Sequence, residues 1–262
     1  MEKLPAQSIV MDDMVWKVHF TDLYMLVETR DGIKKHFNLL CIDTRTMKVI
    51  WKTETAALSW WETIVAVTGR YIVLSLYQDP AFPCTGGLKV MDLGNGSFLW
   101  KNNCYNLAEV KSDDVIRVVD TENDQRETME IKLETGGVLT GFSEGEEGNR
   151  AETERKITPS FYPEGHEYFV QVASFLSLKG YHPVKAIEYA EIDDKVVIGF
   201  YEDTEGGIRF ILLVINVKGE VFWEETGTNQ RDGIGFGTYF LLKEWIVFVR
   251  DKKEIVILSL SI

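Results

Sequence analysis

Short segments in which β-branched or aromatic residues alternate with polar ones recur along almost the whole chain, and this pattern constrains the fold more than any other feature. The clearest example is 87–100, Gly-Leu-Lys-Val-Met-Asp-Leu-Gly-Asn-Gly-Ser-Phe-Leu-Trp, which is typical of two strands joined by a tight turn. Weaker copies of this hairpin lie on both sides of it. Such copies predict a repeated antiparallel architecture and do not indicate a chemistry.

The copies group into meanders of similar length. Strands are predicted in four blocks, the third of them degenerate, at 14–53, 63–100, 107–140 and 186–223. A last block, 237–260, supplies only three strands. We expect the N-terminal segment 7–11 to pair with the edge that this block leaves open, because an unpaired apolar edge strand invites aggregation.

An Asp, a Gly and a Trp recur at fixed spacing in these hairpins. The residues concerned are Asp43, Trp51, Asp92, Gly96, Trp100, Gly219 and Trp223. They resemble the D-x-x-x-G-x-x-x-W unit of quinoprotein-like (PQQ-type) β-propeller repeats, and this resemblance implies that the Gly serves the turn and that the Trp packs between blades. The copies depart from that pattern: Met47 replaces the Gly of the first, Asn216 stands one residue closer to its Trp, and the third keeps Gly136 but lacks the Trp.

The resemblance implies an all-β chain, a β-propeller of about five four-stranded blades closed by the N-terminal strand. Six blades are possible if 156–162 forms a reduced blade. We expect residues 1–262 to be a single domain, since all-β domains often use such a length as one unit. The chain also resembles a small uncharacterised family of bacterial propeller-like proteins, which implies no known activity. The quinone cofactor is not expected, because the repeat implies a fold and not redox chemistry.

Two segments interrupt the strand pattern. Residues 143–156 are rich in Glu and contain no large apolar residue, so we predict a mobile acidic loop. Residues 159–183 are predicted to be a helical insertion between blades, because apolar residues there recur at spacings of three and four. The amphipathic helix is expected near 163–180, with Pro163 and Glu164 in its first turn and Lys179 in its last.

Composition excludes several classes of function. The formal net charge of -13 at pH 7 disfavours nucleic acid and anionic membranes as partners, because both attract basic surfaces. No apolar run is long enough for a signal peptide or a membrane span, so we expect a cytoplasmic protein. Cys41, Cys84 and Cys104 lack any paired spacing, which favours free thiols over disulfides or a zinc site.

Candidate chemistry is sparse. The four His residues are scattered, without the spacing of a metal site, so no metal is predicted. The best candidate surface surrounds the inserted helix, where titratable and aromatic residues gather at both ends. It comprises Tyr162, Glu164, His166, Glu167 and His182.

Two functions follow from this sequence. The first is a non-catalytic interaction module, not an enzyme, that binds a protein, a peptide or a small ligand through one end of the propeller. The alternative is a hydrolase of glycans or phosphorylated sugars, which needs paired carboxylates. Its candidate acids are Asp79, Asp113, Asp114, Asp203, Glu205 and Asp232. The sequence does not predict the oligomeric state.

Overall fold

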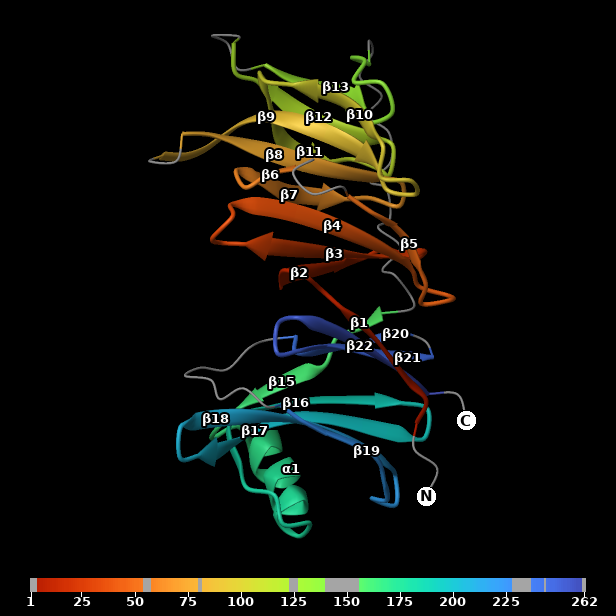
Figure 1. The fold of residues 1–262 in the computed structure, drawn as a ribbon, viewed down its shortest axis with the longest axis vertical. Coiled ribbons are helices and arrows are strands. Elements are labelled where there is room, and N and C mark those ends of the chain that lie inside the picture. Colours follow the sequence, from red (N-terminus) through yellow and green to blue (C-terminus); the bar gives the residue numbers. More distant parts are fainter. Residues whose placement is uncertain are drawn as a thin grey trace. The chain divides into compact units, whose positions relative to one another are not determined.

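The computed structural model describes residues 4–53, 58–79, 82–122, 127–139, 156–227, 237–242 and 244–260. The chain divides into two compact units, which we call the 13–154 unit and the 155–262 unit; residues 1–12 belong to the latter. Each consists of antiparallel sheets (Figure 1). No helix in the described ranges is long and apolar enough to cross a membrane. The single domain expected over 1–262 stays a prediction.

The 13–154 unit contains three sheets, and the first two meanders predicted over these residues are confirmed. The third is confirmed in part, because in place of the strand predicted at 136–140 the described residues form only an isolated bridge between Ile131 and Val138. The first sheet has the order β2 (Met14–Phe20), β3 (Tyr24–Asp31), β4 (His36–Asp43) and β5 (Val49–Lys52), and β6 (Leu58–Ser59) also pairs with β4. The second is β7 (Glu62–Val67), β8 (Tyr71–Asp79), β9 (Phe82–Asp92) and β10 (Phe98–Asn102). The third is β11 (Tyr105–Val110), β12 (Val115–Asp120) and β13 (Thr128–Lys132).

The 155–262 unit contains two sheets. The fourth sheet has the order β15 (Ser160–Pro163), β16 (Pro183–Ile192), β17 (Lys195–Thr204), β18 (Gly207–Asn216) and β19 (Val221–Thr226). The fifth is β1 (Ala6–Val10), β22 (Glu254–Ser259), β21 (Trp245–Arg250), β20 (Tyr239–Leu242) and β14 (Lys156–Ile157). The pairing of β1 with β22 confirms that the N-terminal strand covers the last edge.

The sheets of each unit are stacked, because their strands carry apolar residues on both faces. In β8, Ile72 and Leu74 pack against the first sheet, whereas Tyr71 and Val73 pack against the third. In the 155–262 unit, one face of the fourth sheet packs on the fifth sheet. The opposite face packs on the helix α1 (Glu167–Ser177), through the buried Phe169 and Leu176. The fourth sheet is therefore covered by a sheet on one side and by a helix on the other.

The helix is shorter than predicted and lies elsewhere in the topology. It joins β15 to β16, which are neighbours in one sheet, so it is an insertion within a sheet and not between two. Pro163 ends β15, and α1 starts only after His166, whose Nδ1 accepts a hydrogen bond from the Tyr168 N–H (3.2 Å). Lys179 lies beyond the last turn. Placing Pro163, Glu164 and Lys179 in the helix was wrong, because a side-chain cap at His166 sets its start.

The segment predicted as a possible sixth blade does not form a separate sheet. Lys156 and Ile157 extend the fifth sheet beside β20, and Ser160 to Pro163 extend the fourth beside β16. The described residues thus form five sheets; the closed ring stays a prediction. The acidic loop predicted over 143–156 lies outside the described residues, apart from Lys156.

The repeat residues of the 13–154 unit join successive sheets. The Trp51 Nε1–H of the first sheet donates to the Leu93 carbonyl at the end of β9 (2.8 Å), and the Trp100 Nε1–H of the second donates to the Leu133 carbonyl after β13 (2.7 Å). Asp43 and Asp92 each accept backbone N–H groups of their own turn. Met47, which replaces the turn Gly, adopts the same left-handed conformation (φ 52°).

Candidate functional site

Three aromatic rings form an exposed cluster where β15 leads into α1. The His166 ring stacks on Tyr162 (centroids 5.3 Å apart, planes 20° apart) and on Tyr168 (5.6 Å, 26°), and the rings of Tyr162 and Tyr168 are 5.3 Å apart. Tyr168 is 47% exposed. We call Tyr162, His166 and Tyr168 the ring cluster. Both Tyr162 and His166 were predicted from the sequence, whereas the helical period of Tyr168 had suggested only a packing role.

A hollow of about 310 Å³ lies between α1 and the strands β16 to β18. Another hollow, of about 450 Å³, lies in the 13–154 unit and is described below. Its walls are mainly apolar, from Val172, Phe175, Val196, Ile198 and Ile215. Tyr189 lines the hollow as well, and its ring centroid lies 6.5 Å from that of Tyr162. The ring cluster and this α1 hollow therefore form one continuous surface within the 155–262 unit.

Carboxylates border the ring-cluster end of this surface. Glu167 occupies the first turn of α1, and Glu191 accepts a 2.5 Å hydrogen bond from the Tyr189 hydroxyl. Burial, followed by this contact with Glu191, raises the pKa of Tyr189, so its hydroxyl stays protonated near neutral pH. Glu164 accepts a hydrogen bond from the Lys185 backbone N–H (3.2 Å). The arrangement can bind a cationic group but contains no obvious nucleophile with its base.

Lysines border the opposite end of the hollow. Lys179 lies after α1, and its ammonium donates a 2.6 Å hydrogen bond to the Gly219 carbonyl while lying 5.3 Å from the centre of the Phe175 ring. Lys218 lines the hollow beside it. The α1 hollow is therefore polarised, with acids near the ring cluster and bases near Gly219.

His182 does not join the ring cluster, although the sequence had grouped the two. Its backbone N–H donates to Glu202 Oε1 of β17 (2.7 Å), and the residue is exposed. The predicted surface thus contributes Tyr162, Glu164, His166 and Glu167 to one place. Tyr189 lies beside Tyr162 but was not predicted as a site residue. In the sequence it follows the same alternating pattern as every other residue of β16, and nothing marks it as functional.

The acids proposed for a hydrolase do not form a pair around a cleft in the described parts of the chain. The Asp113 carboxylate accepts a hydrogen bond from the Gly69 N–H (2.9 Å), in a turn of the neighbouring sheet. Asp114 faces the exposed Arg70 (3.7 Å). Asp203 and Glu205 are exposed at the hairpin between β17 and β18. The side chain of Asp79 and all of Asp232 lie outside the described residues.

The larger hollow lies in the 13–154 unit, and its buried charge is already paired. Ser59, Trp61, Glu62 and Tyr77 contribute to its walls. Glu62 is 7% exposed; its carboxylate lies 3.3 Å from the Lys89 ammonium and accepts the Ser59 N–H (3.2 Å). A carboxylate neutralised in this way is structural, because its charge and both of its oxygens are satisfied.

Comparisons with known proteins add little about chemistry. Residues 20–100 match a family described as "Domain of unknown function (DUF4905)", which is less than half of the chain. No curated protein matches.

Three solved structures illustrate the structural matches. BamB from Moraxella catarrhalis is 10% identical (91% of this chain, 82% of that chain, TM-score 0.28). A member of the DUF4221 family from Bacteroides vulgatus is 11% identical (97% and 96%, TM-score 0.35). The β-propeller domain of the Trilobed protease from Pyrococcus furiosus is 10% identical (95% and 68%, TM-score 0.32). TM-scores this low do not establish a shared fold.

Proposed function

We propose that this protein is a non-catalytic binding module of the β-propeller type, and that it binds a segment of a partner protein at the ring cluster and the α1 hollow. One observation carries this proposal: the stacked rings of the ring cluster lie next to Tyr189, which lines the apolar α1 hollow. Exposed aromatic residues beside an apolar pocket are the usual anchors of protein recognition.

The sheets support the propeller part of the proposal. Stacked antiparallel meanders joined by Trp contacts are the arrangement that the PQQ-type repeat implies, and the fourth and fifth sheets share the same meander order. We therefore take the five sheets as blades. The cytoplasmic location expected from composition remains part of the proposal.

Charge complementarity decides the kind of partner. The chain carries a formal net charge of -13, and Glu164, Glu167 and Glu191 border the ring cluster. A Lys or Arg placed over the exposed Tyr168 ring would gain both a cation–π contact and these carboxylates. An apolar side chain next to it would fill the hollow. We infer a partner segment that combines a basic residue with an adjacent large apolar residue.

The test begins with a random peptide library selected on the immobilised chain, followed by affinity measurements on synthetic peptides. We expect enrichment of peptides with a basic residue beside an apolar one, and binding that weakens as salt rises. Tyr168→Ser should weaken binding about tenfold, the effect of removing an anchor worth about 1.4 kcal/mol. Because Tyr168 is half exposed, this substitution leaves the fold intact.

Phe98→Ser is the matched control, since Phe98 is 54% exposed but belongs to β10 of the other unit. It should leave the affinity unchanged. Peptides that bind wild type and Tyr168→Ser equally, or a selection that enriches nothing, would refute the proposed site.

A further inference from the structure

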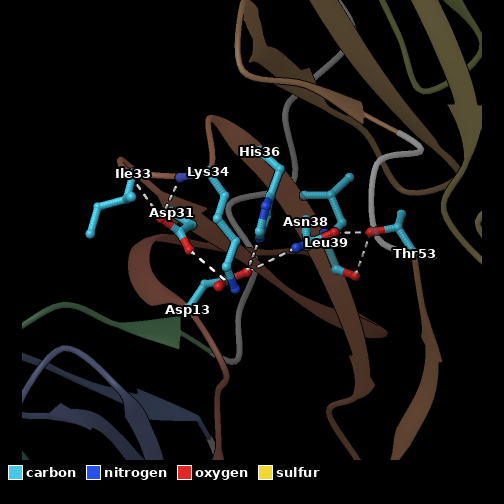
Figure 2. A network of polar contacts seen from close by, with 8 residues as sticks. All are labelled: Asp13, Asp31, Ile33, Lys34, His36, Asn38, Leu39 and Thr53. Atoms are coloured by element: carbon cyan, nitrogen blue, oxygen red, sulfur yellow. Dashed lines mark hydrogen bonds and ion pairs between the residues drawn. The ribbon is translucent and has the colours of Figure 1, made fainter.

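Two carboxylates and an imidazole from three strand ends meet at one end of the first sheet (Figure 2). Asp13 immediately precedes β2, Asp31 ends β3 and His36 begins β4. One nitrogen or oxygen ligand atom from each lies within 4.8 Å of the others. The sequence had predicted no metal here, because His36 has no acid at a conventional ligand spacing.

The cluster is sheltered from water. The side chains of Asp13, His36 and Asp31 are only 8%, 12% and 18% exposed. Two carboxylates brought together in such surroundings repel each other unless a cation lies between them. Removing them from water also strengthens their attraction to any cation that reaches them.

The groups that now contact Asp13 and Asp31 leave carboxylate oxygens of both residues available to bind a cation. Within the described residues, the hydrogen bonds to Asp13 reach Oδ2, from His36 Nε2 (2.8 Å) and Asn38 Nδ2 (2.9 Å). Asp31 Oδ1 accepts the backbone N–H groups of Ile33 and Lys34. Asp31 Oδ2 lies 3.7 Å from the Lys34 ammonium, and this Lys side chain is 72% exposed. A mobile ammonium is easily displaced.

Asn38 provides an independent indication of a ligand. This residue is 4% exposed, and its carboxamide points at the cluster through the Nδ2 contact with Asp13 (Figure 2). Its Oδ1 is buried and has no hydrogen-bond partner among the described residues. Because Nδ2 is the atom that faces Asp13, Oδ1 points away from the cluster in this rotamer. A half-turn of the carboxamide would exchange the two atoms and aim Oδ1 at a bound cation, which would satisfy this buried oxygen.

We propose that Asp13, Asp31 and His36, with the carboxamide oxygen of Asn38, bind one divalent transition-metal ion. The imidazole decides the class, because Ca²⁺ and Mg²⁺ prefer ligand sets made of oxygen alone, whereas Zn²⁺ and its neighbours accept mixed nitrogen and oxygen sets. The ion would link the start of β2 to the hairpin between β3 and β4, and it would stabilise the first sheet. This inference is independent of the proposed partner-binding surface.

Calorimetric titration of the chelator-treated full chain with Zn²⁺ tests the site, with Ca²⁺ titrated separately. We expect saturable binding of one Zn²⁺ per chain, weak or absent binding of Ca²⁺, and a higher melting temperature with Zn²⁺. His36→Gln should weaken Zn²⁺ binding at least tenfold. This variant keeps an N–H donor for Asp13 and so preserves the fold, which circular dichroism verifies. Asp31→Asn, on the hairpin, should weaken binding similarly.

His182→Gln is the control, because His182 is an exposed histidine outside the cluster. It should bind Zn²⁺ like the wild type. The site is refuted if no saturable binding of one ion occurs, or if His36→Gln and Asp31→Asn both bind Zn²⁺ as the wild type does. Binding of Ca²⁺ in preference to Zn²⁺ would overturn the assignment to a transition metal.

Discussion

The indole of Trp51 in β5 covers Gly96 in the turn between β9 and β10, so closely that a Cβ on Gly96 would lie 2.8 Å from two carbons of the ring. The same relationship joins Trp100 to Gly136, where a Cβ would lie 3.0 Å from the ring. In the 155–262 unit, the corresponding Gly219 faces Lys179 and Phe175 instead. The helix segment thus takes the place that a Trp holds in the other unit.

Gly96→Ala should destabilise the chain by about 3 kcal/mol, because the new Cβ meets the Trp51 ring and because φ at this position is +72°. Chemical denaturation measures the loss. Gly165→Ala separates the two causes, since Gly165 also has a positive φ (+90°) but nothing within 4 Å of its Cβ position. It should cost about 1 kcal/mol. Equal losses in the two variants would contradict the packing role of Trp51.

Replacing the repeat Trp residues by Phe should distinguish those that donate a hydrogen bond from the one that does not. Trp51→Phe and Trp100→Phe each remove an indole N–H donor from a carbonyl and should cost about 1–2 kcal/mol more than Trp223→Phe, although the Leu93 carbonyl keeps its weaker contact with the Cys41 thiol (3.6 Å). The Nε1 of Trp223 is buried but has no partner within the described part of the chain. Denaturant melts of the three variants measure the differences, and a Trp223→Phe loss as large as the others would refute this account.

Arg30 holds together the end of the first sheet and the start of the second. Its guanidinium donates to Glu28 (2.6 Å) and to the carbonyl oxygens of Trp60 (3.0 Å) and Glu62 (2.8 Å). Arg30→Met leaves the Glu28 carboxylate, only 3% exposed, without its main partner and should cost about 3–5 kcal/mol.

Arg45→Met is the control, because it also removes an arginine from an ion pair, with Asp43, but the Arg45 side chain is 63% exposed. Its loss should be much smaller than that of Arg30→Met, because solvent screens an exposed ion pair. Adding Glu28→Gln to Arg30→Met should recover part of the stability, since no buried charge then remains. A double-mutant cycle measures this recovery, and its absence would show that Arg30 stabilises the chain through its carbonyl contacts and packing and not through Glu28.

Glu188 should make the chain less stable as the pH rises, which is the opposite of the usual effect of an acid. Burial raises the pKa of Glu188 above its ordinary value of 4.5, although the N–H groups of Gly237 and Thr238 and the Thr238 hydroxyl bond to its carboxylate and lower it in part. Because the folded state holds this proton more tightly than the unfolded chain, the free energy of unfolding falls as the pH rises above 4.5.

Melting of wild type and Glu188→Gln across pH 4 to 8 tests this sign, since other titrating groups cancel in the difference. The stability advantage of wild type over Glu188→Gln should shrink with rising pH. An advantage that grows with pH would mean that the hydrogen bonds outweigh burial at Glu188.

Local patterns were enough to predict most strands, but only those groupings of side chains whose members are close in the sequence, such as Tyr162 with His166. Alternation in β8 and the turn Gly96 are visible in sequence, because strand and turn preferences act over a few residues. The helix start was misplaced because Pro163 satisfies the rule for a first turn, whereas the side-chain cap at His166 decides where the helix begins. Tyr189 and Asn38 could not be selected, since each looks like any other strand residue.

The sequence by itself determined the meanders, the N-terminal strand at the last edge and the repeat of turn and Trp, because these depend on periodicity and on residues close in the chain. Only the tertiary structure decided that α1 covers the fourth sheet, that Tyr189 lies beside Tyr162 and lines the α1 hollow, and that Asp13 meets Asp31 and His36. Those contacts join residues on different strands, and strand pairing, not local preference, sets which side chains become neighbours.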